Sequence, residues 1–174
     1  MDLICVRGLI TIFVIIYLLK NHLITTVFKI NRRLDYSVRV LLLLAKHTPG
    51  TRQSIPDIQK EMLIPRAFIR RIVADLVSAG LIGSRPGRNG GIHLVREIHS
   101  ISLRDIWEAI EGPLMISPCL EAPGVCPLDK TCPVRSKWIA LQILISTELE
   151  SVRLDQLAQE AFDLRKLEIS ARQH

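Results

Sequence analysis

Three of the four cysteines of this chain lie in a short stretch that can form neither a long helix nor a long strand. It reads Cys119-Leu-Glu-Ala-Pro-Gly-Val-Cys126-Pro-Leu-Asp-Lys-Thr-Cys132, and Pro118 and Pro133 flank it. Each proline lacks a backbone N–H donor and interrupts regular hydrogen bonding. The stretch therefore predicts a loop that brings three thiols together. We call the wider loop, residues 113–134, the cysteine segment.

The number of clustered cysteines argues against a disulfide framework. Three thiols cannot all pair within the segment, and the fourth, Cys5, lies far away in the sequence. This usage indicates a reducing compartment, so we expect a cytoplasmic protein with a metal or cluster site. Thiolates select iron-sulfur clusters, zinc or copper. The Cys-x6-Cys-x5-Cys spacing lacks the close pairs of zinc ribbons and bacterial ferredoxins, and by itself leaves zinc and a cluster open.

Charge is divided unevenly along the chain. Residues 29–96 hold 13 basic against 4 acidic residues, residues 97–174 hold 8 against 12, and the whole chain has a net charge of +6. A surplus of this kind in one half indicates a polyanionic partner such as double-stranded DNA. A solvated basic face is the alternative.

The first 28 residues form an apolar leader. Gly8 to Leu19 contains no charged residue, but its twelve residues fall short of the roughly 20 that a membrane-spanning helix needs. No small-residue cleavage site follows, which argues against a signal peptide. We expect translation of the working protein to begin near Val27 or Phe28. A membrane-tethered regulator is the alternative, and membrane association is expected only if the leader is retained.

Three helices are predicted in the basic half. Apolar residues at helical spacing predict the first from Asn31 to Lys46. Ser54 can cap the second, with Asp57 completing a capping box, and this short helix ends near Met62. The third is expected over residues 66–79, ended by Gly80 in a left-handed conformation.

The third helix has one apolar and one basic face. Its predicted buried stripe is Ile69, Ile72, Val73, Leu76 and Val77. The opposite face holds arginines beside small residues, which permits close approach to the major groove. The candidate DNA-binding residues on this helix are Arg66, Ala67, Arg70 and Arg71. An ordinary solvent-exposed helix is the alternative.

Two short strand-like runs follow, at residues 81–84 and 91–95. The turn between them is rich in glycine and arginine and predicts a hairpin. Such a hairpin can act as a wing that reaches into the minor groove, and Arg85, Arg88 and Asn89 are its candidate contacts. The predicted fold class is mainly α with a small β-wing: a winged helix-turn-helix at residues 29–112.

Beyond the wing, Ser102 is expected to cap a helix from Leu103 to Ile110. A long helix is then expected to start near Pro133 and to run to about Val152. We interpret residues 133–174 as a dimerisation helix with a C-terminal tail. Its wide apolar stripe requires a partner, either the same chain's winged helix or a second copy. The stripe comprises Trp138, Leu141, Ile145, Leu149 and Val152, widened by Ile139, Ile143 and Leu144.

Several of these motifs together resemble one protein family. They are Leu34-Asp-Tyr-Ser-Val-Arg39, Ile64-Pro65, Ala79-Gly-Leu-Ile-Gly-Ser-Arg85 leading into Gly90-Gly91, and the three-cysteine loop. In this order and spacing they are similar to the IscR/NsrR, or Rrf-type, family of bacterial iron-sulfur transcription regulators. The similarity extends from about residue 28 to about residue 161.

The resemblance implies a homodimer that binds a palindromic operator. It also implies a repressor that senses nitric oxide, iron or redox status. It implies cluster ligation by Cys119, Cys126 and Cys132. In the nitric-oxide-sensing branch an aspartate supplied across the dimer is a further ligand, and the matching residue is Asp35. The IscR branch uses a histidine where this chain has Arg135. This departure favours a four-iron cluster, with a two-iron cluster as the alternative.

Enzymatic activity is not expected, and neither is a small-molecule substrate. The sequence offers no phosphate-binding glycine loop, no Ser/His/Asp arrangement and no cofactor fingerprint. The competing interpretations are a zinc-stabilised or cluster-free winged-helix regulator and a redox carrier that uses the same cysteines.

Overall fold

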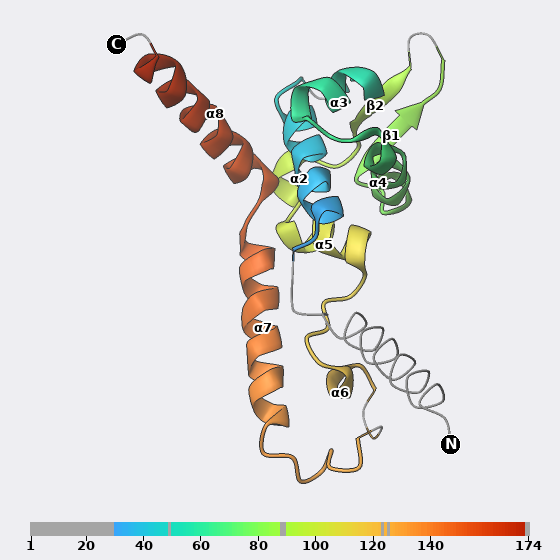
Figure 1. Cartoon of the computed structure of the whole chain (residues 1–174), viewed down its shortest axis with the longest axis vertical. Helices are drawn as coiled ribbons and strands as arrows, with labels where there is room; N and C mark the ends of the chain where they lie inside the picture. Colours follow the sequence, from blue (N-terminus) through green and yellow to red (C-terminus); the bar gives the residue numbers. More distant parts are fainter. Residues whose placement is uncertain (1–29, 49, 88–89, 123, 125, 173–174) are drawn as a thin grey trace, which may run out of the picture. The chain divides into compact units, whose positions relative to one another are not determined.

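The basic half of the chain folds as three helices followed by a β-hairpin (Figure 1). The computed structural model describes residues 30–48, 50–87, 90–122, 124 and 126–172. The apolar leader expected at residues 1–28 lies outside them. The elements are α2 (Arg32–Ala45), α3 (Ile55–Met62), α4 (Arg66–Ser78), β1 (Ile82–Arg85) and β2 (Gly91–Leu94). The predicted fold class, mainly α with a small β-wing, is confirmed.

Local capping explains where these helices begin and end. The Asn31 side chain accepts a hydrogen bond from the Leu34 amide at the start of α2, and Ser54 accepts one from the Asp57 amide at the start of α3. Each bond satisfies an amide that lacks an intrahelical partner. Leu63 ends α3 with a φ of 53°, and Gly80 follows α4 with a φ of 69°. The predicted caps Ser54 and Gly80 are confirmed.

The hydrophobic core lies where α2, α3, α4 and α5 (Leu103–Glu111) meet. Val40, Leu41 and Ile58 are fully buried there, and Tyr36 packs edge-on against Phe68 with ring centroids 5.2 Å apart. Four of the five residues predicted as the buried stripe of α4 belong to this core. Val77 does not, because it lies past the edge of the stripe and is 38% exposed.

The wing contains a second backbone pairing, which the sequence did not predict. β1 and β2 are antiparallel, with Ile82 opposite Leu94 and Arg85 opposite Gly91. Gln53, just before α3, pairs with Ile92 through two backbone hydrogen bonds of 2.9 Å. The wing is thereby attached to the segment that enters the helix-turn-helix.

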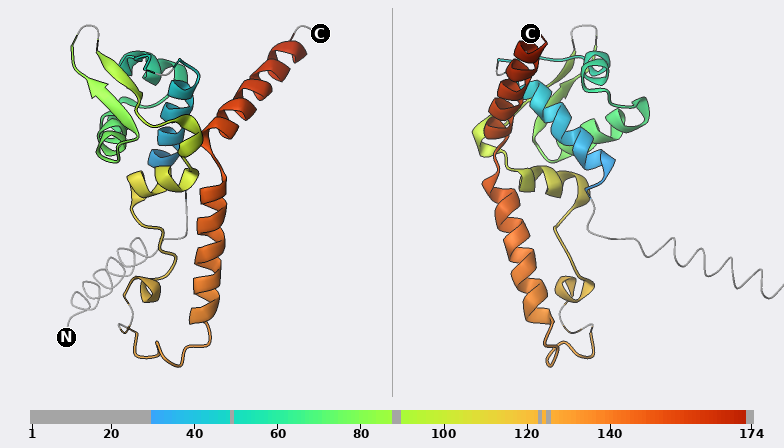
Figure 2. Two further views of the ribbon diagram at one scale, coloured as in Figure 1. Left: turned by 180° about the vertical axis from the view of Figure 1, so that it is seen from behind. Right: turned by 60° about the vertical axis from the view of Figure 1, so that its left-hand side comes forward.

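The second half contains a 3-10 turn, η1 (Ile98–Ser100), and four helices. They are α5 (Leu103–Glu111), α6 (Pro118–Glu121), α7 (Arg135–Ser151) and α8 (Leu154–Ala171). The expected tail is therefore largely helical. In both views of Figure 2, α7 runs beside the cysteine segment. The Ile116 amide donates to the Gln142 side chain of α7 at 3.3 Å, which joins the two.

A short backbone pairing separates α7 from α8. Val152 is extended and its carbonyl accepts from the Leu103 amide at 3.0 Å, while the Leu154 amide donates to the Ile101 carbonyl at 2.9 Å. Leu154 is fully buried. The long helix therefore ends where the chain pairs with the segment before α5. Among the helices of the described residues, none has the length and hydrophobicity required to cross a bilayer.

We predict that Gly91→Ala destabilises the protein more than Gly80→Ala. Gly91 has a φ of 144°, and a Cβ there would lie 2.6 Å from the Gln53 carbonyl oxygen. Gly80 also has a positive φ of 69°, but nothing lies within 4 Å of its would-be Cβ. The Gly80 variant should lose about 1 kcal/mol of unfolding free energy, and the Gly91 variant about 2 to 3 kcal/mol. Denaturant titration measures both losses of unfolding free energy. Equal losses would contradict the close approach of a Cβ at residue 91 to the Gln53 carbonyl oxygen.

We predict an acid-sensitive capping box at the start of α5. Burial raises the pKa of Asp105, but hydrogen bonds from the Ser102 amide and hydroxyl and from Arg96 outweigh it, so the pKa lies below its ordinary value. A carboxylate with a lowered folded-state pKa stabilises the protein above about pH 4 and loses this contribution as the pH falls further.

Asp105→Asn should therefore lower the unfolding free energy at pH 7, with a difference from wild type that shrinks near pH 3. Denaturant titration at both pH values is the measurement. Glu160→Gln, an exposed carboxylate on α8, is the control and should show no such trend. A difference for Asp105→Asn that stays constant between the two pH values would exclude the proposed linkage.

Candidate nucleic-acid interface and cysteine segment

One face of α4 presents the basic side chains that the sequence predicted. Arg66, Ala67 and Arg70 are exposed, while the opposite face is buried in the core. Arg71 is also exposed, and its Nε lies 3.0 Å from Asp75 Oδ1, one turn further along α4. An exposed basic helix that follows a short capped helix has the geometry of a helix that enters the major groove. We call α4 the recognition helix.

The wing adds further basic residues. Arg85 is exposed at the end of β1. Arg88 and Asn89, the other predicted wing contacts, lie outside the described residues. Arg52 is exposed beside Gln53, on the segment that pairs with β2. Arg52 was not among the residues predicted from the sequence. Its place beside the wing depends on the pairing of Gln53 with Ile92, which lies 39 residues further along the chain.

The three cysteines are free and half-buried. Cys119 lies in α6, where its Sγ is 3.2 Å from the Ser117 hydroxyl, and Cys126 and Cys132 lie in the following loop. Their donor chemistry suits a thiolate-ligated cluster or zinc. Within the part of the chain that the structure describes, however, no three His, Cys, Asp or Glu side chains are gathered at metal-binding distance.

Asp129 links the middle of the cysteine segment to the start of α7. Its Oδ2 accepts from the Gly124 amide at 2.8 Å, and its Oδ1 forms an ion pair with Arg135 at the start of α7. The Asp129 side chain is only 16% exposed. Arg135, which stands at the position of the IscR-branch histidine, thus acts as a structural cation. Asp129 was not among the residues predicted from the sequence, because its role depends on the contact with Arg135.

Asp35 lies in the first turn of α2, far from the cysteine segment along the sequence. Its Oδ2 is 2.8 Å from Arg39 Nη2, one turn along the helix, and the carboxylate is 46% exposed. Arg39 also lies over the Tyr36 ring, 5.4 Å from its centroid. The structure thus shows the carboxylate in an ion pair. A ligand role would require Asp35 to leave Arg39.

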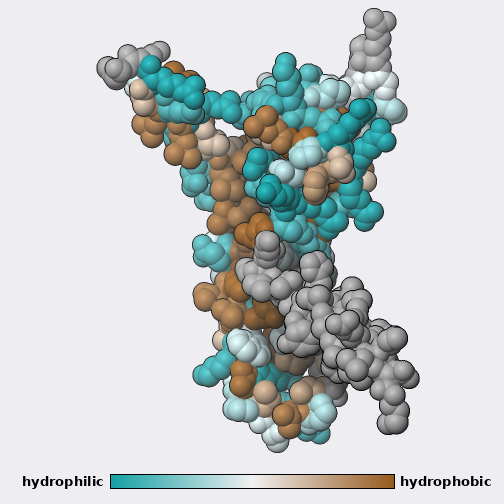
Figure 3. All heavy atoms as spheres, viewed as in Figure 1, coloured by the Kyte–Doolittle hydropathy of each residue, from teal (hydrophilic) through white to brown (hydrophobic). Residues whose placement is uncertain are grey.

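The apolar side chains of α7 lie at the surface. Figure 3 shows them as a brown band along this helix. None of the residues of α7 is buried, and Ile143 and Leu144 are 60% and 66% exposed. Of the two partners considered for this helix, its own winged helix covers it only in part: α7 packs on α5, but most of its apolar band stays exposed.

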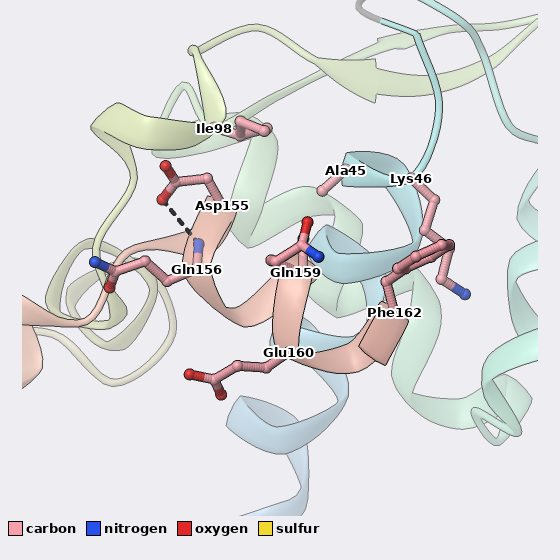
Figure 4. A pocket seen from close by; sticks show the side chains of 9 residues that line it. Ala45, Lys46, Ile98, Asp155, Gln156, Gln159, Glu160 and Phe162 are labelled. Atoms are coloured by element: carbon pink, nitrogen blue, oxygen red, sulfur yellow. Dashed lines mark hydrogen bonds between the residues drawn. The ribbon is translucent and has the colours of Figure 1, made fainter. Parts of the chain in front are cut away.

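An open hollow of about 760 Å3 lies between α8, the end of α2 and η1. Figure 4 shows Lys46, Asp155, Gln159 and Phe162 among its walls. The polar groups there have partners elsewhere: Asp155 Oδ1 accepts from the Gln156 amide at 2.9 Å, and Lys46 Nζ contacts Glu61 Oε1 at 3.1 Å. The polar side chains that line the hollow between α8 and α2 are therefore not directed at a common point.

The fold and its exposed basic helix define the class: a winged-helix DNA-binding regulator. Residues 30–160 match the family described as Rrf2, iron-dependent transcriptional regulator. The chain therefore belongs to the Rrf2 family of transcriptional regulators.

Named relatives and solved structures agree with this assignment. The chain is 28% identical to the regulator IscR of Vibrio campbellii over 83% of this chain and 84% of that protein. It is 25% identical to NsrR of Bacillus subtilis over 80% and 96%, respectively. It superposes on CymR, the global cysteine regulator of B. subtilis, with a TM-score of 0.62 and 29% identity, covering 76% of this chain and 97% of that one. For IscR of T. potens the TM-score is 0.61, with 25% identity and coverage of 76% and 88%.

We predict that Arg70→Ala weakens DNA binding, because Arg70 lies at the centre of the exposed basic face. A lost base contact should cost about 1 to 3 kcal/mol and relax sequence preference at one position, whereas a lost phosphate contact should reduce the salt slope by about one. Fluorescence anisotropy over a salt series distinguishes these two roles. Arg165→Ala on α8 removes the same charge away from the recognition helix and is the control. An unchanged affinity for Arg70→Ala would remove this residue from the interface.

Proposed function

We propose that this chain is a homodimeric transcriptional regulator, acting as a repressor in the cytoplasm, whose three clustered cysteines hold an iron-sulfur cluster. The observation that supports this most is the cysteine segment itself: three free, half-buried thiols between the winged helix and α7. The matched family is described as iron-dependent. The resemblance to the IscR/NsrR type favours a four-iron cluster, with a two-iron cluster as the alternative.

Cys119, Cys126 and Cys132 would hold the cluster as thiolates. When bound, the cluster would supply iron atoms that nitric oxide or oxygen can reach. Iron depletion would instead leave the cysteines without a cluster. Asp35, from the partner subunit, would provide a further oxygen ligand after release from Arg39. Asp129 and Arg135 would keep the loop closed beside Cys126 and Cys132, because their ion pair joins the loop to the first turn of α7.

The proposed homodimer would form through α7. Its exposed apolar band would lose contact with water when two copies pair, which is the main driving force for association. A two-fold dimer presents two recognition helices, and this arrangement matches a palindromic operator with half-sites a whole number of helical turns apart.

The cysteine segment would act on DNA binding through this geometry. It connects α5, which packs on the winged helix, to α7, the proposed dimer helix. A change in its conformation would alter the separation of the two recognition helices. Two linked DNA contacts reinforce each other only when their spacing fits both half-sites.

A zinc-stabilised or cluster-free regulator is the second candidate. The cluster-free form of this candidate is favoured because no group of three possible metal ligands is gathered among the described residues. The chain is also similar to CymR, which is named as a global cysteine regulator and not as an iron-dependent one. Zinc and iron-sulfur forms differ in visible absorption, so the two candidates are separable.

We predict that replacing Cys119, Cys126 and Cys132 together by Ser abolishes cluster binding and the response of DNA affinity to it. The full chain is purified without oxygen, and its iron, sulfide, zinc and visible spectrum are measured. An operator is selected from random duplexes with the wild-type protein. Wild type should bind it with different affinity in the cluster-loaded and chelator-treated forms, and the triple variant should show one affinity in both.

Cys5→Ser is the matched control and should behave as wild type, because Cys5 lies outside the segment. A colourless wild-type protein with stoichiometric zinc would select the second candidate. Equal DNA affinity of the loaded and chelator-treated wild type would reject the sensing function while leaving DNA binding intact.

A further inference from the structure

The Arg33 side chain joins the recognition helix to the end of α5. Arg33 lies in the first turn of α2. Its Nη1 is 3.9 Å from Asp75 Oδ2 on α4, and its Nη2 is 3.4 Å from Glu111 Oε1 at the end of α5. The same Nη2 donates to the Ile110 carbonyl. One guanidinium therefore contacts two helices other than its own.

The surroundings of Arg33 make these contacts more than a surface ion pair. The side chains of Arg33, Asp75 and Glu111 are 32%, 16% and 27% exposed. The Ile110 carbonyl belongs to the last turn of α5, where carbonyls lack intrahelical donors and the helix dipole favours a cation. A guanidinium can serve several acceptors at once because its donors form a planar fork, which an ammonium cannot reproduce. Asn31 also donates to Glu111, at 2.8 Å.

Both ends of this contact lead to functional parts of the chain. The Asp75 carboxylate also contacts Arg71, an exposed arginine of the recognition helix, with 3.0 Å between Asp75 Oδ1 and Arg71 Nε. Glu111 is the last residue of α5, and the cysteine segment begins two residues later. Arg33 thus lies between the element expected to enter DNA and the element that precedes the thiols.

We propose that Arg33 is a positioning residue that couples the recognition helix to the cysteine segment. Asp75 transmits the orientation of α4 to Arg33, and Glu111 with the Ile110 carbonyl transmits the orientation of the α5 terminus. The effect on operator binding rests on the proposed function. The mechanical coupling does not, since it follows from contacts within one chain.

The opposing explanation is that Arg33 adds one more positive charge near DNA. A phosphate contact and a positioning contact differ in their salt dependence. Loss of a phosphate contact lowers the slope of log affinity against log salt by about one, whereas loss of positioning lowers affinity at an unchanged slope.

The first measurement uses the DNA-free full chain and hydrogen exchange followed by mass spectrometry. Arg33→Gln should accelerate exchange both in the second half of α4 and in residues 112–117, by about fivefold or more. Asp75→Asn, a change on α4 alone, should accelerate exchange in residues 112–117 as well. Arg32→Gln is the matched control: it removes the same charge one residue away, from an exposed side chain, and should change neither region.

Arg33→Lys separates coupling from charge. It keeps the cation but cannot serve Asp75, Glu111 and the Ile110 carbonyl together, so it should resemble Arg33→Gln more than wild type. If Arg33→Gln leaves exchange in residues 112–117 unchanged, or if Asp75→Asn affects α4 alone, the coupling proposal is wrong. This result does not depend on whether the chain binds a cluster or an operator.

The second measurement is affinity for the selected operator over a salt series. Arg33→Gln should bind about fivefold or more weakly with the wild-type salt slope. A slope reduced by about one would assign Arg33 to a phosphate contact and overturn its positioning role. Absence of operator binding by the wild-type protein would instead reject the proposed function, and the hydrogen-exchange result would still decide the coupling.

Discussion

The backbone pairing between residues 101–103 and residues 152–154 organises the second half of the chain. Two backbone hydrogen bonds, from Leu103 to Val152 and from Leu154 to Ile101, join the two ends of the segment that contains α5, α6 and α7. The fully buried Leu154 anchors the same point in the core. Both ends of this segment are therefore held at the winged helix, and the cysteine segment lies between them. A rearrangement there can reach the winged helix through α5 and, in the proposed dimer, a second copy through α7.

The polar contacts at the edges of the core divide into local and connecting ones. The Ser102 and Asp105 capping box begins α5 and involves neighbours in sequence. Arg33 and Asp129 instead join elements that are distant along the chain or on opposite sides of a loop. Because both are partly shielded from water, their ion pairs are less screened than those on an open surface. In our proposal, Arg33 is the contact through which the cysteine segment and the recognition helix influence each other.

Much of the winged helix could be predicted from the sequence. Ser54, Gly80 and Ser102 marked helix ends correctly, and the spacing of Ile69, Ile72 and Leu76 identified the buried face of α4. Val77 was misassigned because periodicity identifies a direction on a helix but not where its neighbours end. The candidate site was predicted as two regions, a basic face and a thiol loop. The exposed arginines agree with the first, and the ligand roles of the cysteines and Asp35 stay predictions.

The sequence by itself determined the features that depend on near neighbours: helix caps, the glycine turns, the apolar periodicity of α4 and the position of three thiols in a proline-interrupted loop. Only the tertiary structure decided the pairing of Gln53 with Ile92, the pairing of Val152 and Leu154 with the segment before α5, and the contacts of Arg33 and Asp129. The physical reason is range. A cap is satisfied within one helical turn, whereas these hydrogen bonds and ion pairs form only after the core brings distant segments together.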